Sequence, residues 1–105
     1  MTERRVSSRV EVKLFLSQYE KDRQLRVLAA NLSPTGIFVH RVNGPDLCAD
    51  RVVGLELLLP DEKETIWARG EIKRVESDEM ASGLGIEFTG IPELYAARIS
   101  EFIGE

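Results

Sequence analysis

Three arginines lie close together near the start of the chain, at Arg4, Arg5 and Arg9. Residues 1–9 carry a net charge of +2, three arginines against Glu3, whereas the whole chain has a formal net charge of -4. A guanidinium group can donate paired hydrogen bonds to phosphate oxygens or to O6 and N7 of guanine, and it can stack on a base. The cluster predicts an anion or guanine site, although a solvated basic tail would have the same composition.

A second polar segment reads Asn-Leu-Ser-Pro-Thr-Gly at residues 31–36. Its composition is typical of a turn between strands, in which Gly36 supplies a permissive φ and Pro34 fixes another. The same residues can also serve a ligand, because Asn31, Ser33 and the backbone amides near Gly36 offer hydrogen-bond donors and acceptors. A plain turn and a ligand-binding turn both remain open at this point.

The other reactive residue types do not assemble into a known site. Cys48 and His40 are the only cysteine and histidine, which is too few for a zinc site of the usual kind. Gly83 and Gly85 lack the third glycine of a dinucleotide-binding loop, so they are interpreted as structural. The sequence therefore predicts neither an enzyme nor a metalloprotein, because no nucleophile, base and orienting partner come together.

Alternating apolar and polar residues predict the elements that must position these groups. The period of two indicates six short strands at residues 10–17, 25–29, 37–42, 53–59, 66–75 and 84–88, with a polar break at residues 20–23. Near the end, Pro92 suits the first turn of a helix. Apolar residues then recur at spacings of three and four: Ile91, Leu94, Tyr95, Ile99, Phe102 and Ile103.

This pattern predicts a mainly β protein, a six-stranded antiparallel barrel or closed meander that a short C-terminal α-helix closes. With 105 residues, 43% of them hydrophobic, the chain is long enough for one core but not for two. We expect an N-terminal arginine arm at residues 1–9 and a barrel domain at residues 10–105. The arm has little apolar surface to bury, so we expect it to be mobile without a ligand.

Together, these features resemble the PilZ family, whose two signatures are Arg-x-x-x-Arg and (Asp/Asn)-x-Ser-x-x-Gly. Here the first reads Arg-Val-Ser-Ser-Arg at residues 5–9, and the second is the segment at residues 31–36. They occur in the family's order, on a six-strand pattern. Residues 67–72 and 83–88 are similar to later strands of the family, so the resemblance spans nearly the whole chain.

The resemblance implies a receptor for the bacterial second messenger cyclic diguanylate (c-di-GMP), with no catalysis and no cofactor. By position, Arg5 and Arg9 would grip guanines and phosphates, Asn31 and Ser33 would hydrogen-bond a guanine, and Gly36 would let the backbone approach. Arg4, which directly precedes the first signature, resembles the family members that hold a pair of ligands.

The resemblance also implies an unidentified downstream protein, which would read the arm once the ligand has ordered it. An adaptor that keeps the fold but binds no c-di-GMP is the alternative. The acidic net charge argues against DNA or RNA as a partner. The charged N-terminus does not resemble a signal peptide or a membrane anchor, so we expect a cytoplasmic protein without membrane insertion.

Overall fold

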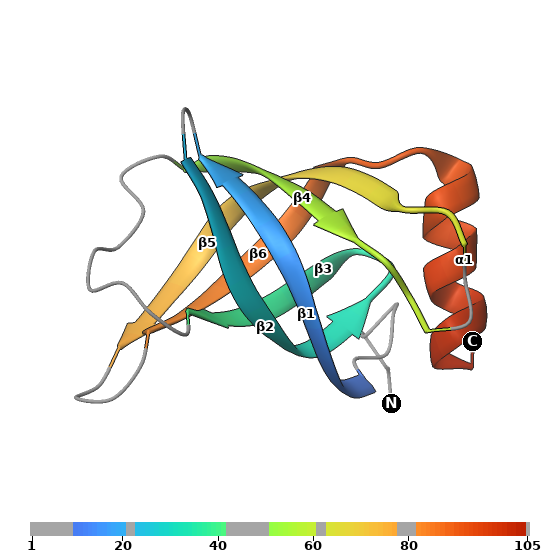
Figure 1. Ribbon diagram of the computed structural model, residues 1–105, viewed down its shortest axis with the longest axis horizontal. Helices are drawn as coiled ribbons and strands as arrows, with labels where there is room; N and C mark the ends of the chain where they lie inside the picture. Colours follow the sequence, from blue (N-terminus) through green and yellow to red (C-terminus); the bar gives the residue numbers. More distant parts are fainter. Residues whose placement is uncertain (1–9, 21–22, 42–50, 61–62, 78–81, 105) are drawn as a thin grey trace, which may run out of the picture.

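The computed structural model describes residues 10–20, 23–41, 51–60, 63–77 and 82–104. These residues form six strands and one helix (Figure 1). The elements are β1 (Val10–Glu20), β2 (Arg23–Ser33), β3 (Gly36–Arg41), β4 (Val52–Leu57), β5 (Ile66–Ser77), β6 (Ser82–Gly90) and α1 (Glu93–Ile103). The predicted six-stranded antiparallel barrel with a C-terminal helix is therefore confirmed.

The strands close into a barrel in the order β1-β2-β3-β6-β5-β4, and every pairing between neighbours is antiparallel. The chain leaves β3 for β4 on the other side of the barrel, and β6 later pairs with β3. The closed meander was therefore wrong. An alternating pattern fixes which face of a strand is buried, but it does not say which strand is its neighbour.

The polar break expected at residues 20–23 was also wrong at both ends, because Glu20 ends β1 and Arg23 begins β2. Gln18 and Glu20 continue the inward alternation of β1 and are buried. Gln18 donates a hydrogen bond from Nε2 to Oε2 of Glu20 at 2.8 Å, and Arg23 donates to Oε1 of Glu20 at 3.1 Å. These bonds let polar residues occupy inward positions of a strand.

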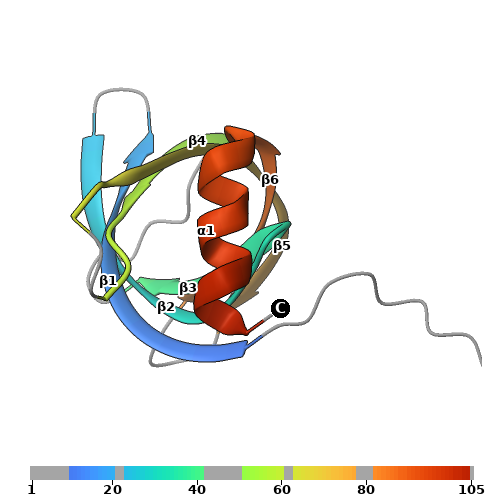
Figure 2. The same cartoon turned by 90° about the vertical axis from the view of Figure 1, so that its right-hand side faces the viewer.

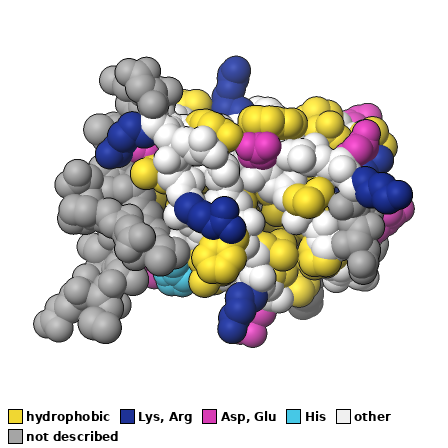
Figure 3. Space-filling view, in the orientation of Figure 1, with side chains coloured by type: hydrophobic (Ala, Val, Ile, Leu, Met, Phe, Trp, Pro, Cys, Tyr) yellow, Lys and Arg dark blue, Asp and Glu magenta, His cyan; other side chains and the backbone are white. Residues whose placement is uncertain are grey.

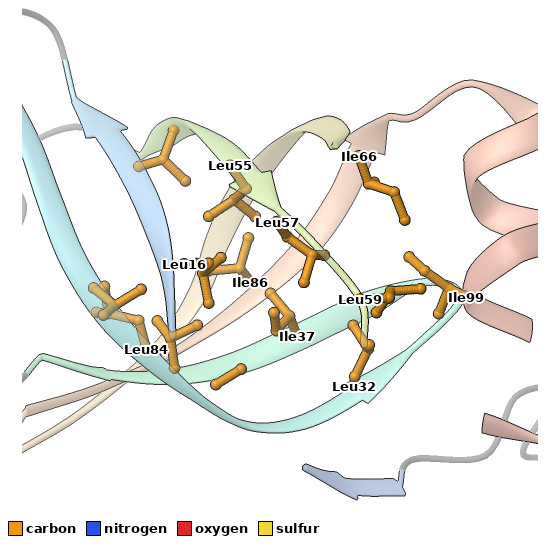
Figure 4. Close-up of a cluster of buried hydrophobic side chains, with 14 of the residues drawn as sticks. Leu16, Leu32, Ile37, Leu55, Leu57, Leu59, Ile66, Leu84, Ile86 and Ile99 are labelled. Carbon is orange, nitrogen blue, oxygen red and sulfur yellow. The ribbon is translucent and has the colours of Figure 1, made fainter. Parts of the chain in front are cut away.

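The barrel interior is filled by aliphatic side chains from all six strands (Figure 4). The helix α1 lies across one mouth of the barrel (Figure 2) and buries Ile99 completely, at 0% exposure. Figure 4 shows Ile99 close to Leu59 and Leu32 at this end of the core. The helix therefore acts as a lid that keeps water from the core.

Two residues that were expected on the buried apolar face of the helix are exposed to solvent. Leu94 and Phe102 are exposed, at 59% and 37%. Pro92, which was expected in the first turn, is the N-cap of the helix, and its carbonyl accepts hydrogen bonds from the backbone N–H groups of Tyr95 and Ala96. A lid touches the barrel along one narrow stripe, so only part of its apolar surface is buried.

Candidate ligand-binding site

The motif at residues 31–36 is mostly strand rather than turn. Asn31 and Ser33 belong to β2, and the turn itself is formed by Pro34 and Thr35. Ser33 is 1% exposed, and its hydroxyl accepts hydrogen bonds from the backbone N–H groups of Thr35, at 3.2 Å, and Gly36, at 3.1 Å. Such local side-chain bonds stabilise tight turns, so Ser33 fixes the shape of this one.

Gly36 is required by space rather than by a left-handed backbone. Among the described glycines only Gly104, at the end of α1, has a positive φ. A Cβ added to Gly36 would lie 2.6 Å from the carbonyl oxygen of Ile86 on β6. The Phe88 N–H also donates to the Thr35 carbonyl at 2.9 Å. Because of this close approach, the turn has a fixed position against β6.

Asn31 has an unusual environment on the outer face of β2. It lies opposite Glu11 on β1 and Phe38 on β3, and the register shifts beside it in both pairings. Its Oδ1 atom is buried and has no hydrogen-bond partner among the residues that the structure describes. A buried polar atom without a partner is costly, and bulges often redirect side chains near functional sites. Asn31 is thus a candidate ligand contact on geometric grounds.

The row that contains Asn31 and Phe38 continues through Gly85 on β6 to Arg74 on β5. Gly85 has no side chain, so the Arg74 guanidinium reaches across β6 and lies 5.6 Å from the centre of the Phe38 ring. The Phe38 ring itself covers Gly83, where an added Cβ would lie 2.5 Å from its Cζ atom. The four side-chain positions therefore form one continuous strip over four strands.

A pocket with a volume of about 410 Å³ lies beside this strip. It is lined by Thr35, Gly36, Lys73, Arg74, Gly85, Ile86 and Glu87. The volume is within the usual range for small-molecule sites. The pocket joins the turn after Ser33 to two cations on β5, so it combines hydrogen-bonding groups with positive charge.

Each pocket cation already has an acidic partner. Lys73 Nζ lies 3.2 Å from Oε1 of Glu71 and 3.6 Å from Oε1 of Glu87. The hydrogen bond to Glu71 and the negative charge of that carboxylate raise the pKa of Lys73, and Glu87 adds a smaller effect. Arg74 Nε lies 3.0 Å from Oε2 of Glu76. An anionic ligand would compete with these carboxylates for both cations.

Sequence reasoning missed Lys73, Arg74 and Glu87 as site residues. Charges of both signs on the outer face of a strand are typical of a solvated surface, so these residues did not stand out from the sequence. The signal that could have found them is the pair Gly83 and Gly85, which leaves two successive outer positions of β6 without side chains. That signal depends on knowing that β6 lies between β3 and β5.

Several predicted residues fall outside the described part of the chain. They are the three arginines of the arm, Arg4, Arg5 and Arg9, and the single cysteine, Cys48, lies outside it as well. Within the described ranges, no group of three or more His, Cys, Asp or Glu side chains is placed to hold a metal ion. No helix in the same ranges has the length and apolar character needed to cross a membrane.

The geometry defines a closed β-barrel domain whose pocket lies on the outer surface and not in the interior. The chain belongs to the PilZ domain family, because the family model matches residues 3–105. No curated protein matches it.

Three solved structures share the fold at low sequence identity. The Bacillus subtilis inhibitor of motility MotI/DgrA has a TM-score of 0.84 at 20% identity, over 97% of this chain and 50% of that chain. The PilZ domain of Escherichia coli YcgR, solved with c-di-GMP, has a TM-score of 0.76 at 11% identity, over 97% of this chain and 90% of that chain. Borreliella burgdorferi PlzA, in complex with c-di-GMP, has a TM-score of 0.68 at 18% identity, over 95% of this chain and 41% of that chain. The chain thus spans half the length of the motility inhibitor.

Proposed function

We propose that this protein is a non-enzymatic receptor for c-di-GMP. The observation that carries the proposal is the strip from Asn31 to Arg74 beside the pocket, in which Asn31 presents a buried acceptor that no other described residue contacts by a hydrogen bond. A nucleotide that contains guanine can donate a hydrogen bond to Asn31 at one end of this strip, and its phosphate oxygens can accept from Arg74 at the other end. The fold shared with YcgR and PlzA, each solved with c-di-GMP, supports the same ligand.

In this proposal, Asn31 accepts a hydrogen bond from one guanine, and Gly36 keeps the turn close against β6 at the wall of the pocket. Ser33 acts by holding the turn in shape. Arg74 and Lys73 exchange a carboxylate partner for a phosphate oxygen, which forms strong charge-assisted bonds. Arg4, Arg5 and Arg9 close over the nucleotide from the other side and contact its phosphates and the O6 and N7 edges of its guanines.

Isothermal titration calorimetry with c-di-GMP tests the proposal directly. We expect binding at micromolar or better affinity, and no binding of GMP or cyclic AMP, because only a ligand with two guanines and two phosphates fills the whole site. Arg5→Ala and Arg9→Ala should each weaken binding by about 2 kcal/mol, the usual scale for bonds that involve a charged group. A flat titration of the folded wild-type protein would exclude this function.

The calorimetric ratio tests the role of Arg4. We expect two ligands per chain, because an arginine at this position can stack on a second, intercalated nucleotide. Arg4→Leu should lower the ratio to one. A ratio of one for the wild-type protein would reject the pair, but it would leave the receptor function in place.

We further propose that the arm carries the signal to a downstream protein in the cytoplasm. The ligand would order residues 1–9 against the barrel and create a joint surface of protein and nucleotide. Backbone hydrogen exchange should then show increased protection at residues 6–10 and 31–36 when c-di-GMP is added, with little change in β4. Protection that changes mainly in β4 would contradict this route.

The second candidate function is a protein adaptor that binds no c-di-GMP. The observation in its favour is that Lys73 and Arg74 already have carboxylate partners, which reduces the positive charge available to a ligand. The same titration separates the two candidates, because an adaptor stays folded and gives no heat with c-di-GMP.

A further inference from the structure

Glu87 is a carboxylate in a pocket that we assign to an anion. It lies on β6 directly opposite Gly36 on β3, and so beside the turn that Ser33 holds in shape. The hydrogen bond between the Phe88 N–H and the Thr35 carbonyl fixes the backbone of β6 against this turn. The Glu87 carboxylate is therefore presented from a rigid strand.

The Glu87 carboxylate also has fewer contacts with cations than the Glu71 carboxylate beside it. Glu71 lies opposite Glu87 on β5, and Lys73 contacts both carboxylates, which offsets the repulsion between two acids that face each other. Glu71 has the shorter contact with Lys73 and a second cation, Arg51 at 3.8 Å. Glu87 has only the contact from Lys73 to its Oε1, and its Oε2 has no partner among the described residues.

A free carboxylate oxygen repels phosphate, so it weakens anion binding unless the ligand also brings hydrogen-bond donors. Guanine does so, because its N1–H and its 2-amino group lie side by side on one edge. A carboxylate is an acceptor with two oxygens, and it matches these two donors as a pair. We propose that Glu87 reads the N1–H and 2-amino edge of one guanine and thereby selects guanine over other bases.

This inference rests on the proposed function, but it assigns Glu87 a task that the cations cannot perform. Arginine and lysine are donors only, so they can read O6 and N7 and cannot read the 2-amino group. Asn31 has a single side-chain oxygen to accept with. Hypoxanthine, the base of inosinate, has O6, N7 and N1–H but lacks the 2-amino group, so it isolates the contribution of one donor.

The experiment compares c-di-GMP with cyclic di-inosinate by calorimetry on three proteins: the wild type, Glu87→Ala and Glu71→Ala. Glu71 is the matched control, because it contacts the same lysine but does not line the pocket. The wild type should bind c-di-GMP about tenfold or more tightly than cyclic di-inosinate, the usual value of a bond to a charged group. Glu87→Ala should bind the two ligands equally, and Glu71→Ala should keep the wild-type preference.

The outcomes separate the inference from the function. If the wild type binds both ligands equally, or if Glu87→Ala keeps the preference, Glu87 does not read guanine and the receptor function still stands. If the wild type binds neither ligand, the proposed function is wrong and this inference fails with it. Glu87 is 56% exposed, so its replacement by alanine should leave the fold intact, and circular dichroism checks this.

Discussion

Two phenylalanines on the outer surface of the barrel lie near arginine side chains, yet they differ greatly in burial. Phe15 on β1 has Arg26 at 5.1 Å from its ring centre and is 54% exposed. Phe38 on β3 has Arg74 at 5.6 Å and is 8% exposed. Figure 3 shows the open face over β1 and β2, where hydrophobic side chains lie among basic and acidic ones.

The difference comes from the residues opposite each ring. Phe15 lies opposite Leu28, whose side chain occupies the neighbouring outer position. Phe38 lies opposite Gly85 and over Gly83, so its ring fills the space above β6. The ring of His40 makes a T-shaped contact with the same ring, with centroids 5.2 Å apart. The glycines on β6 thus leave space for the Phe38 ring, which is buried beside the pocket although it lies on the outer surface of the barrel.

The largest expected effect is on stability. Phe38→Ala should lower the free energy of unfolding by about 3 kcal/mol, because it removes a packed ring from between two strands. Phe15→Ala should cost about 1 kcal/mol, since half of that ring is already in water. Urea unfolding of the two variants measures the contrast. Equal losses of stability would show that Gly83 and Gly85 do not make the packing of Phe38 stronger than that of Phe15.

The next largest effect on stability is expected from replacing a glycine that lies under the Phe38 ring. Gly83→Ala should destabilise the protein by up to about 3 kcal/mol, because the new Cβ would meet the Phe38 ring at 2.5 Å and force it to move. The control is Gly54→Ala on β4, where an added Cβ comes no closer than 3.7 Å to the Tyr19 Cβ. Thermal unfolding should separate the two variants, and a stable Gly83→Ala protein would contradict the packing argument.

A smaller effect is expected on ligand affinity. Arg74→Ala should weaken c-di-GMP binding about tenfold, whereas Arg26→Ala, which removes the matching arginine on the open face, should leave it unchanged. Calorimetry on both variants makes the comparison. The assignment of the pocket to the ligand is wrong if the two variants bind equally well.

The smallest effect concerns the titration of Lys73. Its pKa is raised mainly by Glu71, so the stabilisation from its ammonium group is fully present below the ordinary lysine pKa and is lost as the pH rises through the raised value. Side-chain NMR titration should show a larger fall of this pKa in Glu71→Gln than in Glu87→Gln. The reverse order would mean that Glu87 holds Lys73 more firmly than the distances indicate.

The period of two was sufficient to predict the strands and their inward faces, because burial on one face leaves its mark on every second residue. Val53, Leu55, Leu57 and Leu59 are all buried as expected. The pattern could not show that Gln18 and Glu20 also lie inside, since their burial depends on hydrogen bonds between particular side chains.

For the candidate site, the motif residues Asn31, Ser33 and Gly36 could be selected from the sequence, but their separate structural tasks could not. The hydroxyl of Ser33 and the missing Cβ of Gly36 serve the turn, which only the hydrogen bonds and the approach to Ile86 reveal. Arg74 enters the site because two strands distant in sequence flank Gly85. That neighbourhood is a property of the closed strand order.

The pairing of β1 with β4 has a further consequence for how such a domain is used. With the ring closed, each described strand has a hydrogen-bonded neighbour on both sides, so no strand is left as an edge along its whole length for another chain to extend. Recognition then falls mainly to side chains on the outer surface, which can change without disturbing the scaffold. A closed barrel domain of this kind can be fused to other domains with little risk that its strands will pair with theirs.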